Sequence, residues 1–203
     1  MSVEVTTVRH NLERIREAVG PDVEILAAVK YLEAGDLPAL AEAGVTLVGE
    51  NRAQELALKQ DAHGELFDWD FIGALQSRKV RDLAPRVRLI HTVASDSALG
   101  KLEANPVSEV LLQVNVAGEE GKAGIAPAEL AGFVERCPVP VSGLMTMPPF
   151  AEDPEDNRRH FARLAELAGE HGLKRLSMGT TQDYRVAAEE GATIVRIGSA
   201  LYS

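Results

Sequence analysis

RLSMGTTQDYRVAAEEGATIVRIGSAL (175–201) contains two short apolar runs on either side of a helical pattern. The runs RLSMG (175–179) and TIVRIGSAL (193–201) predict strands, and TQDYRVAAEEG between them predicts a helix. An apolar strand, a helix and a second apolar strand form the pattern of a parallel βαβ unit whose sheet is covered by helices. The stretch therefore predicts an α/β fold.

The same alternation extends towards the amino terminus. Six further apolar runs, each followed by a helical pattern, lie at 24–30, 46–50, 68–73, 88–95, 108–116 and 141–147. Eight such repeats favour a closed (β/α)8 TIM barrel over an open doubly wound sheet. An open sheet with fewer strands is the alternative, because the runs 88–95 and 175–179 are the weakest. We predict no helix after the eighth strand and expect a helix over 5–19 to cover that gap. No linker divides the chain, so residues 1–203 are expected to form a single domain.

Composition narrows the class of protein. Of 203 residues, 45% are hydrophobic and 26% charged, enough for a full core and an ordinary surface, so whole-chain disorder is excluded. A net charge of −10 argues against binding nucleic acid or an acidic membrane. No apolar stretch is long enough to span a bilayer, and the first residues do not read as a signal peptide. With Cys137 as its single cysteine the chain has no internal disulfide, and we expect a cytoplasmic protein. No metal-ligand spacing is present, so no metal site is predicted.

Lys30 directly follows the apolar run ILAAV of the first predicted strand. In parallel barrels the chemistry gathers at the carboxyl ends of the strands. An ordinary strand-end lysine extends its ammonium to solvent. At this position the chain opens into the barrel mouth. An amine held among apolar neighbours loses proton affinity, which makes it available to form a Schiff base with a carbonyl.

Two small, hydroxyl-rich turns follow the seventh and eighth predicted strands. Ser177 and Gly179 belong to the first turn, and Gly198 and Ser199 belong to the second. Either turn alone is an ordinary loop, but this pair of positions is where barrels commonly bind a phosphate. A lysine facing a phosphate site suggests pyridoxal 5′-phosphate (PLP) or a phosphosugar, and the residues alone leave both open.

Arg196 has two interpretations. Alternation along the eighth strand places its side chain inside the barrel. There it either pairs with a carboxylate or donates to a bound ligand. His91, on the fourth predicted strand, is expected to be a hydrogen-bonded core residue.

Seven motifs in unbroken order, covering about residues 25–202, closely resemble the YggS/PROSC family of pyridoxal phosphate homeostasis proteins. They are AVKY (28–31), VGENRAQE (48–55), WDFIGALQSRKVR (69–81), LLQVNVAGEEGKAGI (111–125), GLMTM (143–147), LSMGTTQD (176–183) and VRIGSALY (195–202).

The resemblance implies a barrel like the N-terminal domain of alanine racemase, with PLP as the cofactor. It implies that Lys30 holds PLP as a Schiff base. Around the phosphate it places Ser177, Gly179, Gly198 and Ser199. Near the ring it places Asn51 and Met145, and resemblance to the racemase barrel makes Arg196 a donor to the pyridine nitrogen.

Four departures from the family pattern stand out. Val29 takes the place of a common Ser or Thr, Asp70 of a common His, and Arg78 of a common Asn. Thr180-Thr181 replaces Met-Ser, and Thr181 keeps the hydroxyl that the serine would supply.

Two functions from different classes follow from the resemblance. The favoured one is a non-catalytic carrier and buffer in intracellular PLP homeostasis, a monomer with PLP-dependent apo-enzymes as its candidate partners and no catalytic residues. The alternative is a PLP-dependent amino-acid racemase or a related enzyme. Racemisation needs a second base besides Lys30, and the sequence assigns none of Tyr31, Tyr184 and Tyr202 to that role. A Schiff-base aldolase acting on a phosphosugar is a third, weaker reading.

Overall fold

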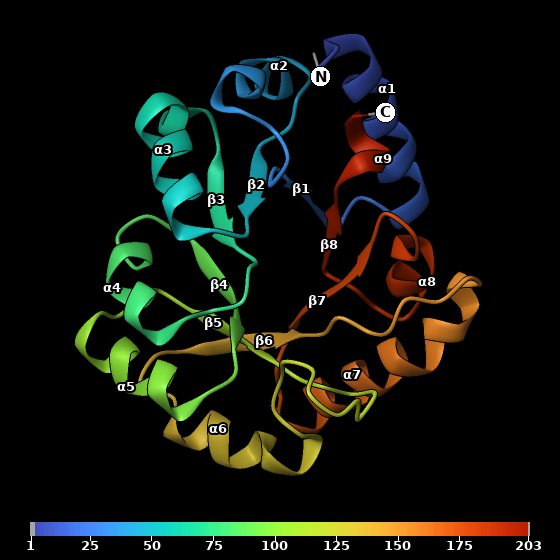
Figure 1. Ribbon diagram of the computed structural model, residues 1–203. Helices are drawn as coiled ribbons and strands as arrows, with labels where there is room; N and C mark the ends of the chain where they lie inside the picture. The colour runs from blue at the N-terminus through green and yellow to red at the C-terminus, as the bar shows by residue number, and fades with distance from the viewer. Residues whose placement is uncertain (1–2, 203) are drawn as a thin grey trace.

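Eight parallel strands close into one barrel in the order of the chain, and β8 pairs with β1 (Figure 1). The (β/α)8 prediction is confirmed, and the open-sheet alternative is wrong. The computed structural model describes residues 3–202. The strands are β1 (Glu24–Ala28), β2 (Leu47–Glu50), β3 (Asp68–Phe71), β4 (Leu89–Val93), β5 (Val110–Gln113), β6 (Val141–Met145), β7 (Arg175–Thr180) and β8 (Ile194–Ile197).

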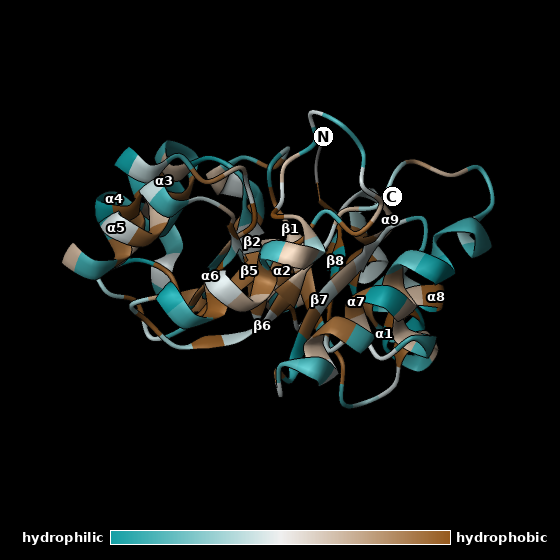
Figure 2. Cartoon of the chain, turned by 90° about the horizontal axis from the view of Figure 1, so that it is seen from below, coloured by the Kyte–Doolittle hydropathy of each residue, from teal (hydrophilic) through white to brown (hydrophobic). Residues whose placement is uncertain are grey.

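Helices surround the barrel and cover the outer face of the strands. They are α1 (Val5–Val19), α2 (Leu37–Glu42), α3 (Ala53–His63), α4 (Val80–Leu83), α5 (Asp96–Ala104), α6 (Leu130–Arg136), α7 (Arg158–Glu170), α8 (Tyr184–Glu189) and α9 (Ser199–Tyr202). Figure 2 shows the consequence for hydropathy: the strands at the centre are largely hydrophobic and the helices carry hydrophilic residues.

The core has two layers, as alternation along a barrel strand requires. The larger layer lies between strands and helices and includes Val48, Trp69 and Val195. The smaller layer fills the barrel interior with one apolar side chain from each of six strands: Leu26, Leu47, Leu89, Leu111, Met145 and Ile194.

Charged side chains close the amino-terminal end of the barrel. Arg88 binds both carboxylate oxygens of Glu24, at 3.0 and 2.9 Å. Arg175 pairs with Glu109 at 3.2 Å. The open end is therefore the carboxyl end of the strands, where the predicted site residues lie.

The end of the chain differs from the prediction. The run 193–201 is not one strand, because β8 ends at Ile197 and the short helix α9 follows. Our expectation that no helix follows the eighth strand is therefore wrong. The predicted cover by 5–19 is confirmed, since α1 packs against both α8 and α9. Within residues 3–202, no helix has both the length and the apolar composition that a membrane crossing demands.

Candidate functional site

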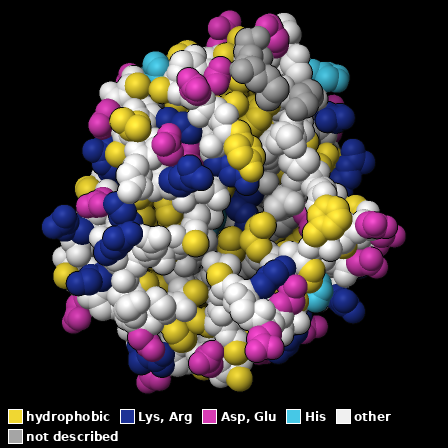
Figure 3. Space-filling model, viewed as in Figure 1, with side chains coloured by type: hydrophobic (Ala, Val, Ile, Leu, Met, Phe, Trp, Pro, Cys, Tyr) yellow, Lys and Arg dark blue, Asp and Glu magenta, His cyan; other side chains and the backbone are white. Residues whose placement is uncertain are grey.

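A cavity of about 530 Å³ lies at the carboxyl ends of the strands. Figure 3 shows a hollow at the centre of one face of the molecule, with basic and hydrophobic side chains around it. Each of the eight strands, or the loop that follows it, contributes to the cavity wall. The lining residues are Ala28, Lys30, Tyr31, Leu32, Asn51, Ile72, Ala74, Thr92, Gln113, Ala123, Met145, Met147, Thr180, Thr181, Arg196, Gly198, Ser199 and Tyr202. The volume and the mixture of apolar walls with a few polar groups suit a small-molecule ligand.

Lys30 lies two residues beyond the end of β1 and lines this cavity. The preceding residue, Val29, still donates its N–H to the Gly49 carbonyl at 3.0 Å, which carries the sheet pairing to the edge of the site. The Lys30 side chain is exposed, and its Nζ lies 4.6 Å from the centre of the Tyr31 ring. The predicted position at the mouth is therefore confirmed, whereas the predicted apolar enclosure is wrong because the chain has already left the sheet.

A buried ion pair holds the backbone next to Lys30 and at Asn51. The Lys59 Nζ, from α3, donates to Glu50 Oε2 at 2.5 Å and to the Val29 carbonyl at 2.7 Å. The other Glu50 oxygen accepts the Asn51 N–H at 2.6 Å. Glu50 and Lys59 thus tie the ends of β1 and β2 to α3. We did not predict this pair. Its only signal in the sequence is a lysine three residues after Leu56, on the buried face of that helix.

Asn51 presents an unused acceptor next to the cavity. Its Oδ1 atom is buried and has no hydrogen-bond partner among the described residues. An orphaned buried acceptor costs free energy until a donor is supplied. Because Asn51 lines the cavity, a bound ligand with a hydrogen-bond donor could satisfy it.

The turns after β7 and β8 meet at one side of the cavity. Thr180, Thr181, Gly198 and Ser199 line it. The Gly198 N–H donates to Thr181 Oγ1 at 3.2 Å, which joins the two turns. These two turns form the hydroxyl-bearing wall that the sequence predicts. In the turn after β7, however, the residues that line the cavity are Thr180 and Thr181.

Ser177 and Gly179, which were predicted around a phosphate, are not among the residues that line the cavity. Ser177 is wholly buried beneath it, and its hydroxyl is engaged by His91 and Arg196. Gly179 has φ +87° and faces α8, where an added Cβ would lie 2.5 Å from the Ala187 Cβ. The pairing of β7 with β8 shifts register between Ser177 and Thr180, which brings the two threonines to the cavity.

Arg196 and Met145 form part of the cavity floor. Arg196 donates from Nη1 to Ser177 Oγ at 2.6 Å and from Nη2 to the Thr146 carbonyl at 2.9 Å. Its Nη2 also lies 2.9 Å from the Met147 sulfur. Burial lowers the pKa of Arg196 to about 10, which leaves the guanidinium charged at neutral pH. No carboxylate among residues 3–202 forms an ion pair with it, so the carboxylate-paired interpretation is wrong.

Below Arg196, polar groups continue into the barrel. His91 Nδ1 lies 2.8 Å from Ser177 Oγ, and His91 Nε2 lies 3.1 Å from Asp70 Oδ2. Arg88 donates to both oxygens of Asp70, at 3.0 and 2.8 Å. His91 is the satisfied core histidine that we predicted. The link from Asp70 to Arg196 was not predicted, since it joins strands that are far apart in the sequence.

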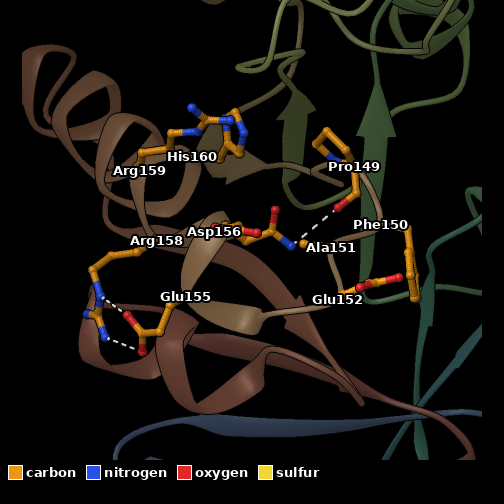
Figure 4. A pocket seen from close by; sticks show the side chains of 10 residues that line it. Pro149, Phe150, Ala151, Glu152, Glu155, Asp156, Arg158, Arg159 and His160 are labelled. Carbon is orange, nitrogen blue, oxygen red and sulfur yellow. Dashed lines mark hydrogen bonds and ion pairs between the residues drawn. The ribbon is translucent and has the colours of Figure 1, made fainter.

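A second hollow lies in the segment 149–160, between β6 and α7. Figure 4 shows Arg158 turned towards Glu155, with Arg159 and His160 in another part of the pocket. Arg158 also pairs with Glu189 and Glu190, so its charge is already matched within the protein. This hollow contains none of the residues predicted for the site.

Comparison with known sequences identifies close relatives. Residues 3–203 match the family "Alanine racemase, N-terminal domain". A pyridoxal phosphate homeostasis protein of Aquifex aeolicus is 40% identical, and the alignment covers 94% of this chain and 93% of the relative. Its counterpart in Pseudomonas aeruginosa is 37% identical over 98% and 96% of the two chains.

Solved structures agree with the fold. PipY of Synechococcus elongatus, solved with PLP bound, superposes with a TM-score of 0.84 at 30% identity and covers 97% of this chain and 100% of its own. Alanine racemase of Corynebacterium glutamicum gives a TM-score of 0.77 at 16% identity, covering 99% of this chain and 61% of the racemase. At that identity the racemase supports the fold alone.

Proposed function

Because the chain belongs to the family of pyridoxal phosphate homeostasis proteins, built on the alanine racemase N-terminal domain, we propose that it binds PLP in the cavity at the carboxyl ends of the strands. We propose further that it holds the cofactor as a carrier and buffer without catalytic turnover. One observation supports the site above all others. Lys30, the Thr181–Ser199 wall and the Arg196 floor line one and the same cavity.

The cavity residues fit the parts of this cofactor. PLP when bound supplies an aldehyde that reacts with amines and a ring that withdraws electrons. Lys30 would hold the cofactor covalently, through the unprotonated form of its Nζ and the aldehyde, with one water as the leaving molecule. Thr181 and Ser199 offer hydroxyl groups to the phosphate oxygens. Arg196 has only donors, so it would donate to the pyridine nitrogen and keep that atom unprotonated.

Asn51 and Met145 complete the proposed site. The orphaned Oδ1 of Asn51 offers an acceptor beside Lys30, and Met145 offers an apolar surface to the ring. Ser177 contacts Arg196 beneath the cavity, and Gly179 packs against α8. Their predicted contact with the phosphate passes to Thr180 and Thr181.

The tyrosines argue for a carrier over a racemase. The Tyr202 hydroxyl donates to the Ala28 carbonyl at 3.0 Å, and burial raises the pKa of this phenol, which keeps it protonated at neutral pH and so unavailable as a base. Tyr31 lies at the exposed rim with its ring against Lys30, on the same side as that amine. Tyr184 lies on α8 in the outer core layer. Among the described residues, no tyrosine is therefore placed to act opposite Lys30.

The covalent site is tested by reductive trapping. PLP added to the purified protein should turn it yellow, and borohydride should fix the cofactor on the peptide that contains Lys30. Lys30→Ala should abolish both signals. Lys79 and Lys122 serve as internal controls, since each pairs with a nearby carboxylate on the surface. An adduct mainly on either of them would overturn the assignment of Lys30.

The phosphate wall is tested with pyridoxal, which lacks the phosphate. Each charge-assisted hydrogen bond lost is worth roughly 1.5–3 kcal/mol, so pyridoxal should bind orders of magnitude more weakly than PLP. Equal affinity for PLP and pyridoxal would show that this wall does not bind the phosphate.

The absence of turnover is tested with amino acids in deuterated water. Chiral chromatography and α-proton NMR should detect neither racemisation nor exchange of common L-amino acids. Turnover near the ordinary enzyme range of about 1–10³ per second would contradict the proposed carrier function and favour a racemase.

We propose in addition that the protein delivers PLP to PLP-dependent apo-enzymes. We propose that it does so as a monomer in the cytoplasm. Mixing the loaded protein with an apo-enzyme should restore that enzyme's activity, and light scattering should give the mass of one chain.

A further inference from the structure

Four polar side chains form a continuous line through the barrel interior. Asp70 comes from β3, His91 from β4, Ser177 from β7 and Arg196 from β8, and the first three are wholly buried while Arg196 is 5% exposed. The contact between His91 and Ser177 crosses the interior, because β4 and β7 are not neighbours in the barrel. The line connects the floor of the cavity with the closed end of the barrel.

The two ends of the line fix the direction of every hydrogen bond in it. A guanidinium only donates, so Ser177 Oγ accepts from Arg196. Burial opposes ionisation of Asp70, but hydrogen bonds from His91 and Arg88 prevail and hold its pKa below the ordinary value. Asp70 is therefore a carboxylate, which only accepts.

His91 between these ends has a single compatible form. Burial lowers its pKa, and the attraction of Asp70 is the opposing influence, so the ring is neutral near pH 7. With a carboxylate at Nε2, the one ring hydrogen lies on Nε2 and points to Asp70. Nδ1 is then an acceptor, and the Ser177 hydroxyl donates its hydrogen to it. That leaves a lone pair of Ser177 Oγ directed at Arg196.

Asp70 is itself held in place. Arg88 donates to both of its oxygens and also to both oxygens of Glu24 at the closed end of the barrel. The Asp70 carboxylate presents Oδ1 to Arg88 and Oδ2 to both Arg88 and His91, so the line depends on two acceptors at this position.

We infer that Asp70, His91 and Ser177 are positioning residues for Arg196, a one-way chain of hydrogen bonds that fixes the guanidinium against the ring nitrogen of the cofactor. The inference rests on the proposed PLP site. Without Ser177 Oγ, Arg196 keeps only the Thr146 carbonyl and the sulfur of Met147, whose side chain is half exposed at the rim.

The direction of the chain is tested without any cofactor. Nitrogen-15 labelling of the five histidines in the apo-protein reports which ring nitrogen carries the hydrogen, and the signal lost in His91→Gln assigns His91. We expect hydrogen on Nε2 and a bare Nδ1 at pH 7. Hydrogen on Nδ1, or a doubly protonated ring, would overturn the inference.

The effect on Arg196 is tested with Ser177→Ala. The PLP dissociation constant should rise by about tenfold, because an Arg196 that is no longer fixed loses its charge-assisted hydrogen bond to the ring nitrogen. The pH at which the visible band of bound PLP changes should shift as well, because the ring nitrogen has lost its fixed donor. Ser177→Thr keeps the hydroxyl and should restore both values. If Ser177→Ala does not fold, Asp70→Asn takes its place: it is close to isosteric, lies three hydrogen bonds from Arg196, and should shift both values in the same direction.

Ser142→Ala is the matched control. This hydroxyl on β6 contacts only the Val110 carbonyl, at 3.5 Å, so its loss should change neither the dissociation constant nor the band. A wild-type protein that takes up no PLP would overturn the proposed function. Normal uptake by the wild type, with an unchanged constant and band in Ser177→Ala, would overturn this inference alone.

Discussion

Glu50 and Lys59 are a charged pair inside the protein, with 0% and 2% of their surfaces exposed. A buried pair of this kind adds little net stability, because each ion has lost its hydration. Removing one partner is costly, since the other charge is left buried without compensation. The pair therefore serves to fix geometry, and what it fixes is the backbone that carries Lys30 and Asn51.

Lys59→Met should reduce the free energy of unfolding by about 3–5 kcal/mol, because Glu50 is left as an unpaired buried carboxylate. Urea denaturation of the apo-protein measures the change. Lys101→Met is the control, since Lys101 is exposed on α5, and its effect should stay within about 0.5 kcal/mol. Adding Glu50→Gln to Lys59→Met should recover part of the loss. An unchanged urea midpoint in Lys59→Met would contradict the role of this pair.

At the residue scale, part of the candidate site was predictable from the sequence. Lys30 and Arg196 were placed correctly, because strand order and alternation alone bring them to the carboxyl end and the interior. The depth of Ser177 was not predictable, since a register shift in β7 separates it from Thr180 and Thr181. The roles of Asp70 and Lys59 depend on contacts between separate elements, which leave no local pattern.

At the scale of elements, α1 closes the side of the barrel where β1 meets β8. Its buried face consists of Val8, Asn11, Leu12, Ile15 and Val19, spaced as one stripe of a helix. The cover over 5–19 was predicted from the gap expected after the eighth strand. The four-residue α9 was not, because so short a helix has no period that separates it from the end of an apolar strand.

Ile15→Ala should lower the free energy of unfolding by about 2–5 kcal/mol, since Ile15 is wholly buried and its loss leaves a cavity under α1. Thermal and urea unfolding measure the effect. Arg14→Ala, one residue away on the exposed face, should have almost none. Equal effects of the two changes would mean that α1 does not carry part of the core.

At the scale of the whole molecule, the barrel interior is apolar in one layer and polar in the next. Apolar strands separated by helices predicted a covered parallel sheet, and the count of eight repeats favoured the closed barrel over the open sheet. The polar layer of Asp70, His91, Ser177 and Arg196 was beyond prediction, and it makes global stability depend on pH.

The free energy of unfolding should fall as the pH is lowered below about 6.5, the ordinary value for histidine. Burial, with Arg196 and Arg88 nearby and Asp70 opposing, holds the pKa of His91 lower than this in the folded state. The unfolded chain therefore binds the proton first, and stability is lost at up to about 1.4 kcal/mol per pH unit. Asp70 adds a loss below its ordinary pKa of 3.8, because its carboxylate takes up a proton in the unfolded chain before it does so in the folded protein.

Urea denaturation at several pH values between 7 and 5 tests this dependence. His91→Gln should flatten it. His160→Gln should keep most of it, since His160 lies in the partly open second hollow. A wild-type stability that does not change over this range would show that folding does not lower the proton affinity of His91.

The pairing of β1 with β8 has a consequence for biosynthesis. The ribosome releases Lys30 early and Arg196 and Ser199 late, so the cofactor cavity is incomplete for nearly the whole of translation. At about 5–20 residues per second, roughly ten to thirty seconds separate these segments. During that time the free edge of β1 has no partner strand, and an unpaired edge is where nascent chains associate wrongly or meet chaperones.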